Sequence, residues 1–228
     1  MQPFIIFATP RSGSTSFVEA LRAMKDVRCM YEVLNHDQYP AEHFGRLLNF
    51  SSHEDAMRQL PLFMERLWQL ACPHCSACGF KVLQQQIKPP GTLLQLFQAV
   101  SPIPRAILLQ RRDVHAQHAS LVKARSTGFW GFPATTAAIR QGVCEASDIA
   151  CQKRVARMHV FDWAPGRNST PDFGAFMRER ERWHTRVQSA AAVSGVPLLV
   201  LQTEMLNGSS ALASTMGIVR DFLGLAGA

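Results

Sequence analysis

The chain has 228 residues, of which 47% are hydrophobic and 18% are charged, and its formal net charge is +7. This size and composition predict a single globular domain over residues 1–228 and exclude an intrinsically disordered chain. We expect a cytoplasmic protein without a membrane anchor, because no run approaches the roughly 20 apolar residues of a membrane span and the N-terminus lacks the pattern of a signal peptide. The positive charge fits a polyanionic ligand, but no dense basic run interleaved with aromatic residues indicates a nucleic-acid partner.

The chain opens with a predicted strand at residues 4–7, a polar loop, and a predicted helix whose apolar face begins at Phe17. Arg11 stands in the loop and is followed by five small residues: Ser12, Gly13, Ser14, Thr15 and Ser16. The start of a helix carries backbone N–H groups without helical partners and a partial positive charge, so it attracts anions. Gly13 allows a ligand to approach the backbone closely, and the Arg11 guanidinium fits oxyanions. The stretch predicts a phosphate-sized anion site, although a turn that only caps a helix has the same composition.

This loop resembles the 5′-phosphosulfate loop of sulfotransferases, whose sulfuryl donor is PAPS (3′-phosphoadenosine 5′-phosphosulfate). The carbohydrate, tyrosylprotein and bacterial branches of that superfamily often carry an Arg where this chain has Arg11. The loop differs from that of nucleotide triphosphatases, because no Gly precedes it and no Lys occupies the cation position. The resemblance implies that PAPS binds here and leaves as PAP. It also implies that Arg11 acts both in binding and in catalysis, with the five small residues as further ligands of the donor.

A second short strand is predicted at residues 27–30, and Glu32 follows it directly. In a parallel α/β sheet the carboxyl ends of the strands line the ligand crevice, so this carboxylate is well placed for chemistry. Several Arg-type sulfotransferases carry a catalytic Glu just after this strand, and tyrosylprotein sulfotransferases show a run similar to residues 26–29. The resemblance therefore implies that Glu32 is the catalytic base. His36 and Asp37 are alternative bases, and Glu32 as a solvated loop carboxylate is the alternative without function.

An apolar stripe predicts a helix within residues 53–71, with a break or a late start at Pro61. Three cysteines follow within seven residues: Cys72, Cys75 and Cys78. Together with His74 they have the spacing of a partial metal site, but zinc requires four ligands and no second Cys or His pair follows at a useful distance. We therefore expect no metal ion, and we expect these cysteines to be reduced in a loop.

A third strand is predicted at residues 79–83 and a short helix at 92–100, separated by a turn rich in Pro and Gly. Related enzymes place a Lys near the end of this strand on the sulfuryl group. Lys81 and Lys88 are both candidates for this role, and the sequence does not choose between them. For each of them, an exposed surface Lys is the simpler interpretation.

The fourth predicted strand, residues 106–109, is uniformly apolar, as a central parallel strand should be. Arg112 follows it, and Ser120 stands eight residues later, about two turns into the next predicted helix. In sulfotransferases an Arg and a Ser at this spacing hold the 3′-phosphate of PAPS, and the Arg-Arg-Asp form resembles bacterial carbohydrate sulfotransferases. The resemblance implies the same role for Arg112 and Ser120, with Arg111 as the alternative if the register shifts by one residue.

Residues 126–170 show no clear periodicity apart from a candidate helix at 135–155, and the resemblance implies that this region covers the acceptor site. The last predicted elements are a helix at 173–193, a strand at 198–201 and a helix at 212–222. Thr203 stands where relatives often have Tyr, which weakens the expectation of an adenine contact there. Cytosolic members continue to a loop rich in Gly and basic residues that covers the 3′-phosphate. This sequence lacks that loop, so we expect other groups to hold the phosphate.

Five strands that alternate with helices predict an α/β fold, namely a P-loop-like, doubly wound, mostly parallel sheet flanked by helices. The implied function is transfer of a sulfuryl group from PAPS to an acceptor hydroxyl, first of a carbohydrate or small metabolite and next of a tyrosyl peptide. Glu32 would take the acceptor proton, while fixed cations would stabilise the leaving phosphate without a metal. The alternatives are a P-loop kinase-like phosphotransferase and a non-catalytic nucleotide-binding protein on the same fold.

Overall fold

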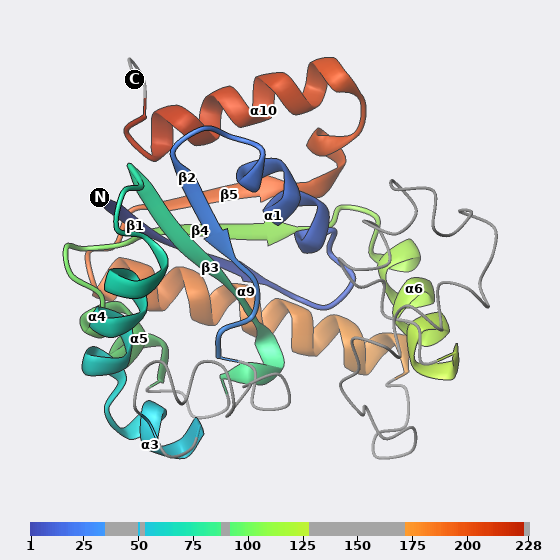
Figure 1. Ribbon diagram of the computed structural model, residues 1–228. Helices are drawn as coiled ribbons and strands as arrows, with labels where there is room; N and C mark the ends of the chain where they lie inside the picture. The colour runs from blue at the N-terminus through green and yellow to red at the C-terminus, as the bar shows by residue number, and fades with distance from the viewer. Residues whose placement is uncertain (35–49, 51–52, 88–91, 128–171, 226–228) are drawn as a thin grey trace.

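The computed structural model describes residues 1–34, 50, 53–87, 92–127 and 172–225. These parts form an α/β fold in which helices flank one sheet (Figure 1). Several sequence-based expectations lie outside the described residues: those for His36, Asp37, Lys88 and residues 128–170 of the predicted acceptor-covering segment 126–170. Among the described helices, none combines the length and the apolar character needed to cross a bilayer.

Within the described residues, five strands form one sheet in the order β2-β3-β1-β4-β5, and every neighbouring pair is parallel. The strands are β1 (Gln2–Ala8), β2 (Val27–Met30), β3 (Ala77–Leu83), β4 (Arg105–Gln110) and β5 (Leu198–Gln202). The predicted five-stranded parallel sheet is therefore confirmed. The chain leaves β1 toward β2 on one side and leaves β4 toward β5 on the other. Open α/β sheets bind ligands at the carboxyl ends of strands where the order reverses in this way.

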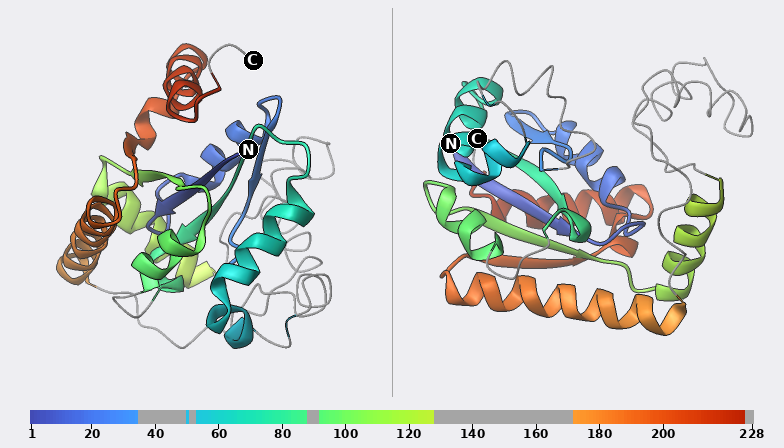
Figure 2. Two further views of the ribbon diagram at one scale, coloured as in Figure 1. Left: turned by 90° about the vertical axis from the view of Figure 1, so that its left-hand side faces the viewer. Right: turned by 90° about the horizontal axis from the view of Figure 1, so that it is seen from below.

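Helices cover both faces of the sheet (Figures 1 and 2). The described helices are α1 (Ser14–Arg22), α3 (His53–Arg58), α4 (Leu60–Ala71), α5 (Thr92–Ala99), α6 (Val114–Thr127), α9 (Phe173–Val193) and α10 (Ser209–Phe222), with short 3₁₀ helices η3 (Gln84–Gln86) and η4 (Thr203–Leu206). α1 and α10 pack on one face, and α4, α5 and α9 pack on the other. α6 lies beyond the carboxyl end of β4, to the right in Figure 1.

β1 lies at the centre of the core, since the side chains of residues 4–8 are all 0% exposed. Phe7 packs edge-on against Trp183 of α9, with the ring centroids 6.1 Å apart. Phe4 faces the other side, where it belongs to the same cluster as Phe17 of α1. Because side chains alternate between two covered faces, every residue of this strand must be apolar, which explains its unbroken hydrophobic run.

Gly79 lies opposite Phe4 where β3 pairs with β1, and this position has no room for a side chain. A Cβ there would overlap the Phe4 ring and the Phe4 carbonyl oxygen. We therefore expect Gly79→Ala to lower the free energy of unfolding, measured in urea, by roughly 1–3 kcal/mol, as in overpacked cores. The control is Gly217→Ala in α10, where a Cβ would meet nothing within 4 Å; it should not destabilise the fold. Equal stability of Gly79→Ala and the wild type would contradict this strand register.

Proline and glycine set helix boundaries that differ from the predicted ones. The helix predicted within residues 53–71 is two helices that meet at Gln59, and Pro61 lies in the first turn of the second, where a proline is tolerated. The predicted break is therefore confirmed. The last helix begins at Ser209, earlier than predicted, because Gly208 precedes it as the N-cap with a φ of 88° that favours glycine.

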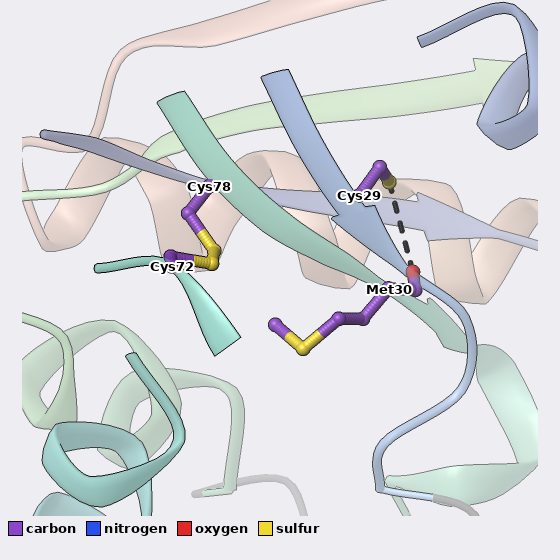
Figure 3. The surroundings of a disulfide bond; sticks show 4 residues. All are labelled: Cys29, Met30, Cys72 and Cys78. Atoms are coloured by element: carbon purple, nitrogen blue, oxygen red, sulfur yellow. Dashed lines mark hydrogen bonds between the residues drawn. A yellow bond between two sulfur atoms is a disulfide. The ribbon is translucent and has the colours of Figure 1, made fainter. Parts of the chain in front are cut away.

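Cys72 and Cys78 form a disulfide that joins the residue after α4 to β3 (Figure 3). The expectation of reduced cysteines in a loop is wrong for these two residues, whereas Cys75 is a free thiol. The physical reason is that β3 begins at Ala77, so Cys78 belongs to the sheet, and its Cα lies 6.1 Å from that of Cys72, which a disulfide spans. The described residues contain no group of three or more side chains that could hold a metal ion.

Candidate functional site

The loop after β1 is shaped by two residues with left-handed backbone, Arg11 with φ 63° and Gly13 with φ 79°. Gly13 caps α1 without a side-chain hydrogen bond, so the cap leaves the first N–H groups of that helix to other acceptors. Gly13 also packs tightly, since a Cβ there would lie 3.3 Å from the Cβ of Thr203. Ser12 is 0% exposed, and its hydroxyl has no hydrogen-bond partner among the described residues. The loop thus offers N–H and O–H donors at a helix start, as an anion site requires.

Two side chains of α6 hold this loop in place. Gln117 is 0% exposed, and its Nε2 donates to Thr9 Oγ1 and to the Pro10 carbonyl, at 2.8 Å each. Arg11 Nε donates to Ser120 Oγ at 2.8 Å. The structure therefore brings Ser120 to Arg11, whereas the sequence motifs assigned these residues to opposite ends of the nucleotide. Sequence reasoning missed Gln117, although its place three residues before Ser120 on one helix face was an available signal.

Three arginines meet at the carboxyl ends of β1 and β4. Arg111 Nη1 donates to the Arg11 carbonyl at 3.3 Å, and Arg180 Nη2 of α9 donates to the Arg111 carbonyl at 2.9 Å. Burial lowers the pKa of Arg11, and the positive charge of Arg111 lowers it further. The Arg112 side chain, in contrast, is exposed. The structure thus places Arg111, the sequence-based alternative, beside Arg11, and it adds Arg180, which the sequence analysis did not single out.

Glu204 follows β5 and holds the turn between β4 and α6. Its carboxylate accepts hydrogen bonds from the backbone N–H groups of Arg112 at 3.0 Å and Asp113 at 3.1 Å. Burial acts to raise the pKa of Glu204, but these two bonds, its own backbone N–H and the Arg111 charge together lower the pKa. An ionised carboxylate therefore fixes the backbone of the turn before α6, which carries Arg111 and Arg112, while Asp113 caps the first turn of α6 through the Ala116 N–H.

A buried ion pair lies at the carboxyl ends of β2 and β3. Lys81 Nζ is 2.7 Å from Glu32 Oε1, and Gln86 Nε2 donates to Glu32 Oε2 at 2.8 Å. The side chains of Lys81 and Glu32 are 4% and 13% exposed, so the interpretations of a surface Lys and of a solvated carboxylate are both wrong. The reason is that β3 lies inside the sheet and the Tyr31 ring covers Lys81, whose Nζ is 5.9 Å from the ring centroid.

A scan against protein-family models found no match, and neither did a search of curated proteins. The sulfotransferase resemblance therefore depends on the sequence motifs, and the structure adds how these motifs are arranged. On the β1–β4 side the site offers guanidinium groups and N–H donors for an anionic ligand. On the β2–β3 side it offers a carboxylate beside an ammonium group, which is suited to proton transfer near negative charge.

His184 of α9 lies under the end of β4, where it is 7% exposed and its Nδ1 accepts a hydrogen bond from Gln110 Nε2 at 3.3 Å. Burial lowers the pKa of His184 from 6.5 to about 4, and the Arg180 charge adds to the effect. At a pH between these two pKa values, the unfolded chain binds a proton at His184 more readily than the folded chain does. The contribution of neutral His184 to the free energy of unfolding is therefore fully present above pH 6.5, and it is lost as the pH falls toward about 4. We expect this loss, measured as the free energy of unfolding in urea, to be at most about 3 kcal/mol.

The matched variants for this pH dependence are His184→Gln and His74→Gln. Gln at position 184 keeps a partner for Gln110 but does not titrate, so its free energy of unfolding should fall less across the same pH window. His74 is exposed, so the free energy of unfolding of His74→Gln should depend on pH as that of the wild type does. An unchanged pH dependence in His184→Gln would mean that other groups cause it.

Proposed function

We propose that the chain transfers a sulfuryl group from PAPS to an acceptor hydroxyl. The observation that carries the proposal is the hydrogen bond from Arg11 Nε to Ser120 Oγ. This bond joins the two segments that resemble the phosphate-binding motifs of sulfotransferases, and Arg111 contacts the same loop. PAPS carries a phosphosulfate and a phosphate on one nucleoside. A donor site for it needs cations and hydroxyl groups from both segments within the reach of one ligand.

The donor side would act through charges that are fixed before the donor arrives. Arg11 and the first N–H groups of α1 hold the 5′-phosphosulfate and stabilise the charge that develops on the leaving phosphate. Arg111 and Ser120 hold the 3′-phosphate, with Arg112 as the second candidate. The Ser120 hydroxyl can accept from Arg11 and donate its own proton to a phosphate oxygen, so it links the two ends of the ligand.

The acceptor side would depend on the pair of Glu32 and Lys81. Glu32 takes the proton of the acceptor hydroxyl during transfer, for which one of its oxygens must exchange a present partner for the acceptor. The Lys81 ammonium, 2.7 Å from that carboxylate, then faces the negative charge of the sulfuryl group. The arginines and Lys81 supply the positive charge, so the reaction requires no metal. A carbohydrate or small metabolite is the first candidate acceptor, and a tyrosyl peptide is the next.

Calorimetric binding of PAP compared with ATP, followed by an acceptor screen with labelled PAPS, tests this function. PAP should bind more tightly than ATP, which lacks the 3′-phosphate, and the label should reach at least one hydroxyl acceptor. Tighter ATP binding with phosphoryl transfer would instead favour a kinase-like enzyme. PAP binding without transfer to any acceptor would favour a non-catalytic nucleotide-binding protein. The absence of PAP binding would contradict both the sulfotransferase and the non-catalytic protein that binds this nucleotide.

The two neighbouring arginines after β4 give a sharper prediction. Because Arg111 contacts the Arg11 loop while Arg112 is exposed, Arg111→Ala should weaken PAP binding by roughly 10–100-fold, the effect of losing a hydrogen bond to a charged group. Arg112→Ala should weaken it less. Adenosine 5′-phosphosulfate, which lacks the 3′-phosphate, should lose much less affinity in either variant. If both nucleotides are weakened equally, neither arginine selects the 3′-phosphate.

A further inference from the structure

Arg180 stands on α9 one turn before Trp183 and His184, which are two of the buried residues of this helix. Its Nη2 donates a hydrogen bond to the Arg111 carbonyl at 2.9 Å. In Figure 1, α9 lies below the sheet and its first turns point toward α6. The guanidinium thus ends at the same carboxyl edge as the Arg11 loop.

The charge of Arg180 is poorly compensated where it lies. Among the described residues, no carboxylate comes within ion-pair distance of it, and its Nε is buried without a hydrogen-bond partner. Burial lowers the pKa of Arg180, although Glu181 and Glu204 act in the opposite direction from further away. A partly desolvated guanidinium without an anion beside it costs free energy.

We infer that Arg180 is a further donor-binding residue, whose guanidinium joins Arg11 and Arg111 to hold a phosphate group of the nucleotide. The inference rests on the proposed function, which supplies a ligand with two anionic groups. Of the five N–H donors of a guanidinium, Arg180 uses one, from Nη2, on the described chain. The remaining donors match the fork that phosphate oxygens accept. Arg180 would thereby add a cation to those that the sequence motifs assign to the nucleotide phosphates.

Arg180→Gln, Arg180→Lys and the control Arg182→Gln test this role. Gln keeps an N–H donor for the Arg111 carbonyl but removes the charge, and Lys keeps the charge without the fork. Arg182 lies on the same helix, is exposed, and bonds only the Arg178 carbonyl within the described chain. We expect calorimetry to show PAP affinity reduced by roughly 10–100-fold in Arg180→Gln, reduced less in Arg180→Lys, and unchanged in Arg182→Gln.

Binding of adenosine separates ligand contact from a purely structural role, because adenosine carries no phosphate. Its affinity should stay the same in Arg180→Gln, as should the thermal midpoint without ligand. PAP affinity within twofold of the wild type in Arg180→Gln, or an equal loss for PAP and adenosine, would overturn the inference. If Arg180→Gln does not fold, the test depends on Arg180→Lys. PAP affinity of Arg180→Lys equal to that of the wild type would then overturn the inference.

A second arm separates this inference from the proposed function. If the wild type does not bind PAP, the proposed donor is wrong, and inorganic pyrophosphate becomes the probe of the arginine site. Pyrophosphate should then raise the thermal midpoint of the wild type and of Arg182→Gln, but not that of Arg180→Gln. Equal shifts in all three proteins, or no shift in the wild type, would show that Arg180 holds no phosphate group.

Discussion

Arg11→Ala is expected to reduce sulfuryl transfer to any acceptor by roughly 10²–10³-fold, the effect of losing one preorganised donor at a site of developing charge. The expectation follows from the position of Arg11 in the loop before α1, where its Nε donates to Ser120 Oγ and its carbonyl accepts from Arg111 Nη1. The measurement is initial rate with labelled PAPS, together with calorimetric binding of PAP, which should weaken as well.

The backbone at this position calls for a matched variant. Because Arg11 has φ 63°, alanine keeps the left-handed strain that arginine already carries there, whereas glycine removes it. Arg11→Gly should therefore lose activity as Arg11→Ala does while its thermal midpoint is kept. Arg28→Ala removes an exposed arginine from β2 and should remain fully active. Wild-type rates in both Arg11 variants would remove this residue from the mechanism.

Glu32→Gln should retain PAP binding and lose turnover by roughly 10²–10⁴-fold, the contribution of a well-placed general base. The substitution also leaves the buried Lys81 without its carboxylate, which costs stability by up to about 3–5 kcal/mol. Activity and stability must therefore be separated. The measurements are turnover with the best acceptor of the screen, PAP affinity by calorimetry, and the free energy of unfolding in urea.

The double variant Glu32→Gln with Lys81→Met makes that separation. It replaces the buried charge with an apolar side chain of similar length, so it should recover most of the lost stability but none of the turnover. Lys81→Met alone leaves Glu32 with Gln86 as a partner and should still bind PAP. If the folded double variant keeps substantial turnover, the base lies elsewhere, and His36 is the next residue to replace.

The sheet was predictable because its signal is local. Residues 4–7 and 106–109 are uniformly apolar, which is typical of strands buried on both faces, and the structure has β1 and β4 there. The polar loop after β1 was also predictable, because Gly13 and the hydroxyl residues stand directly between the predicted strand and helix. Helix boundaries were less exact where a glycine cap, such as Gly208, moved the start.

The pairings between segments were not predictable, because they depend on strand order and on how helices pack. The sequence favoured a surface position for Lys81, yet the placement of β3 between β2 and β1 buries this residue against Glu32. Arg180 lies within the helix predicted at residues 173–193, and only the packing of α9 below β4 brings it to Arg111. The Cys72–Cys78 disulfide likewise requires that β3 begin beside the end of α4.

A crystal structure with PAP bound would test the donor site most directly. We predict that one phosphate lies within hydrogen-bond distance of Arg11 and the first N–H groups of α1, while the other contacts Ser120 and Arg111. PAP bound elsewhere on the molecule, with the 2.8 Å bond between Arg11 and Ser120 unchanged, would contradict the proposed sulfuryl transfer.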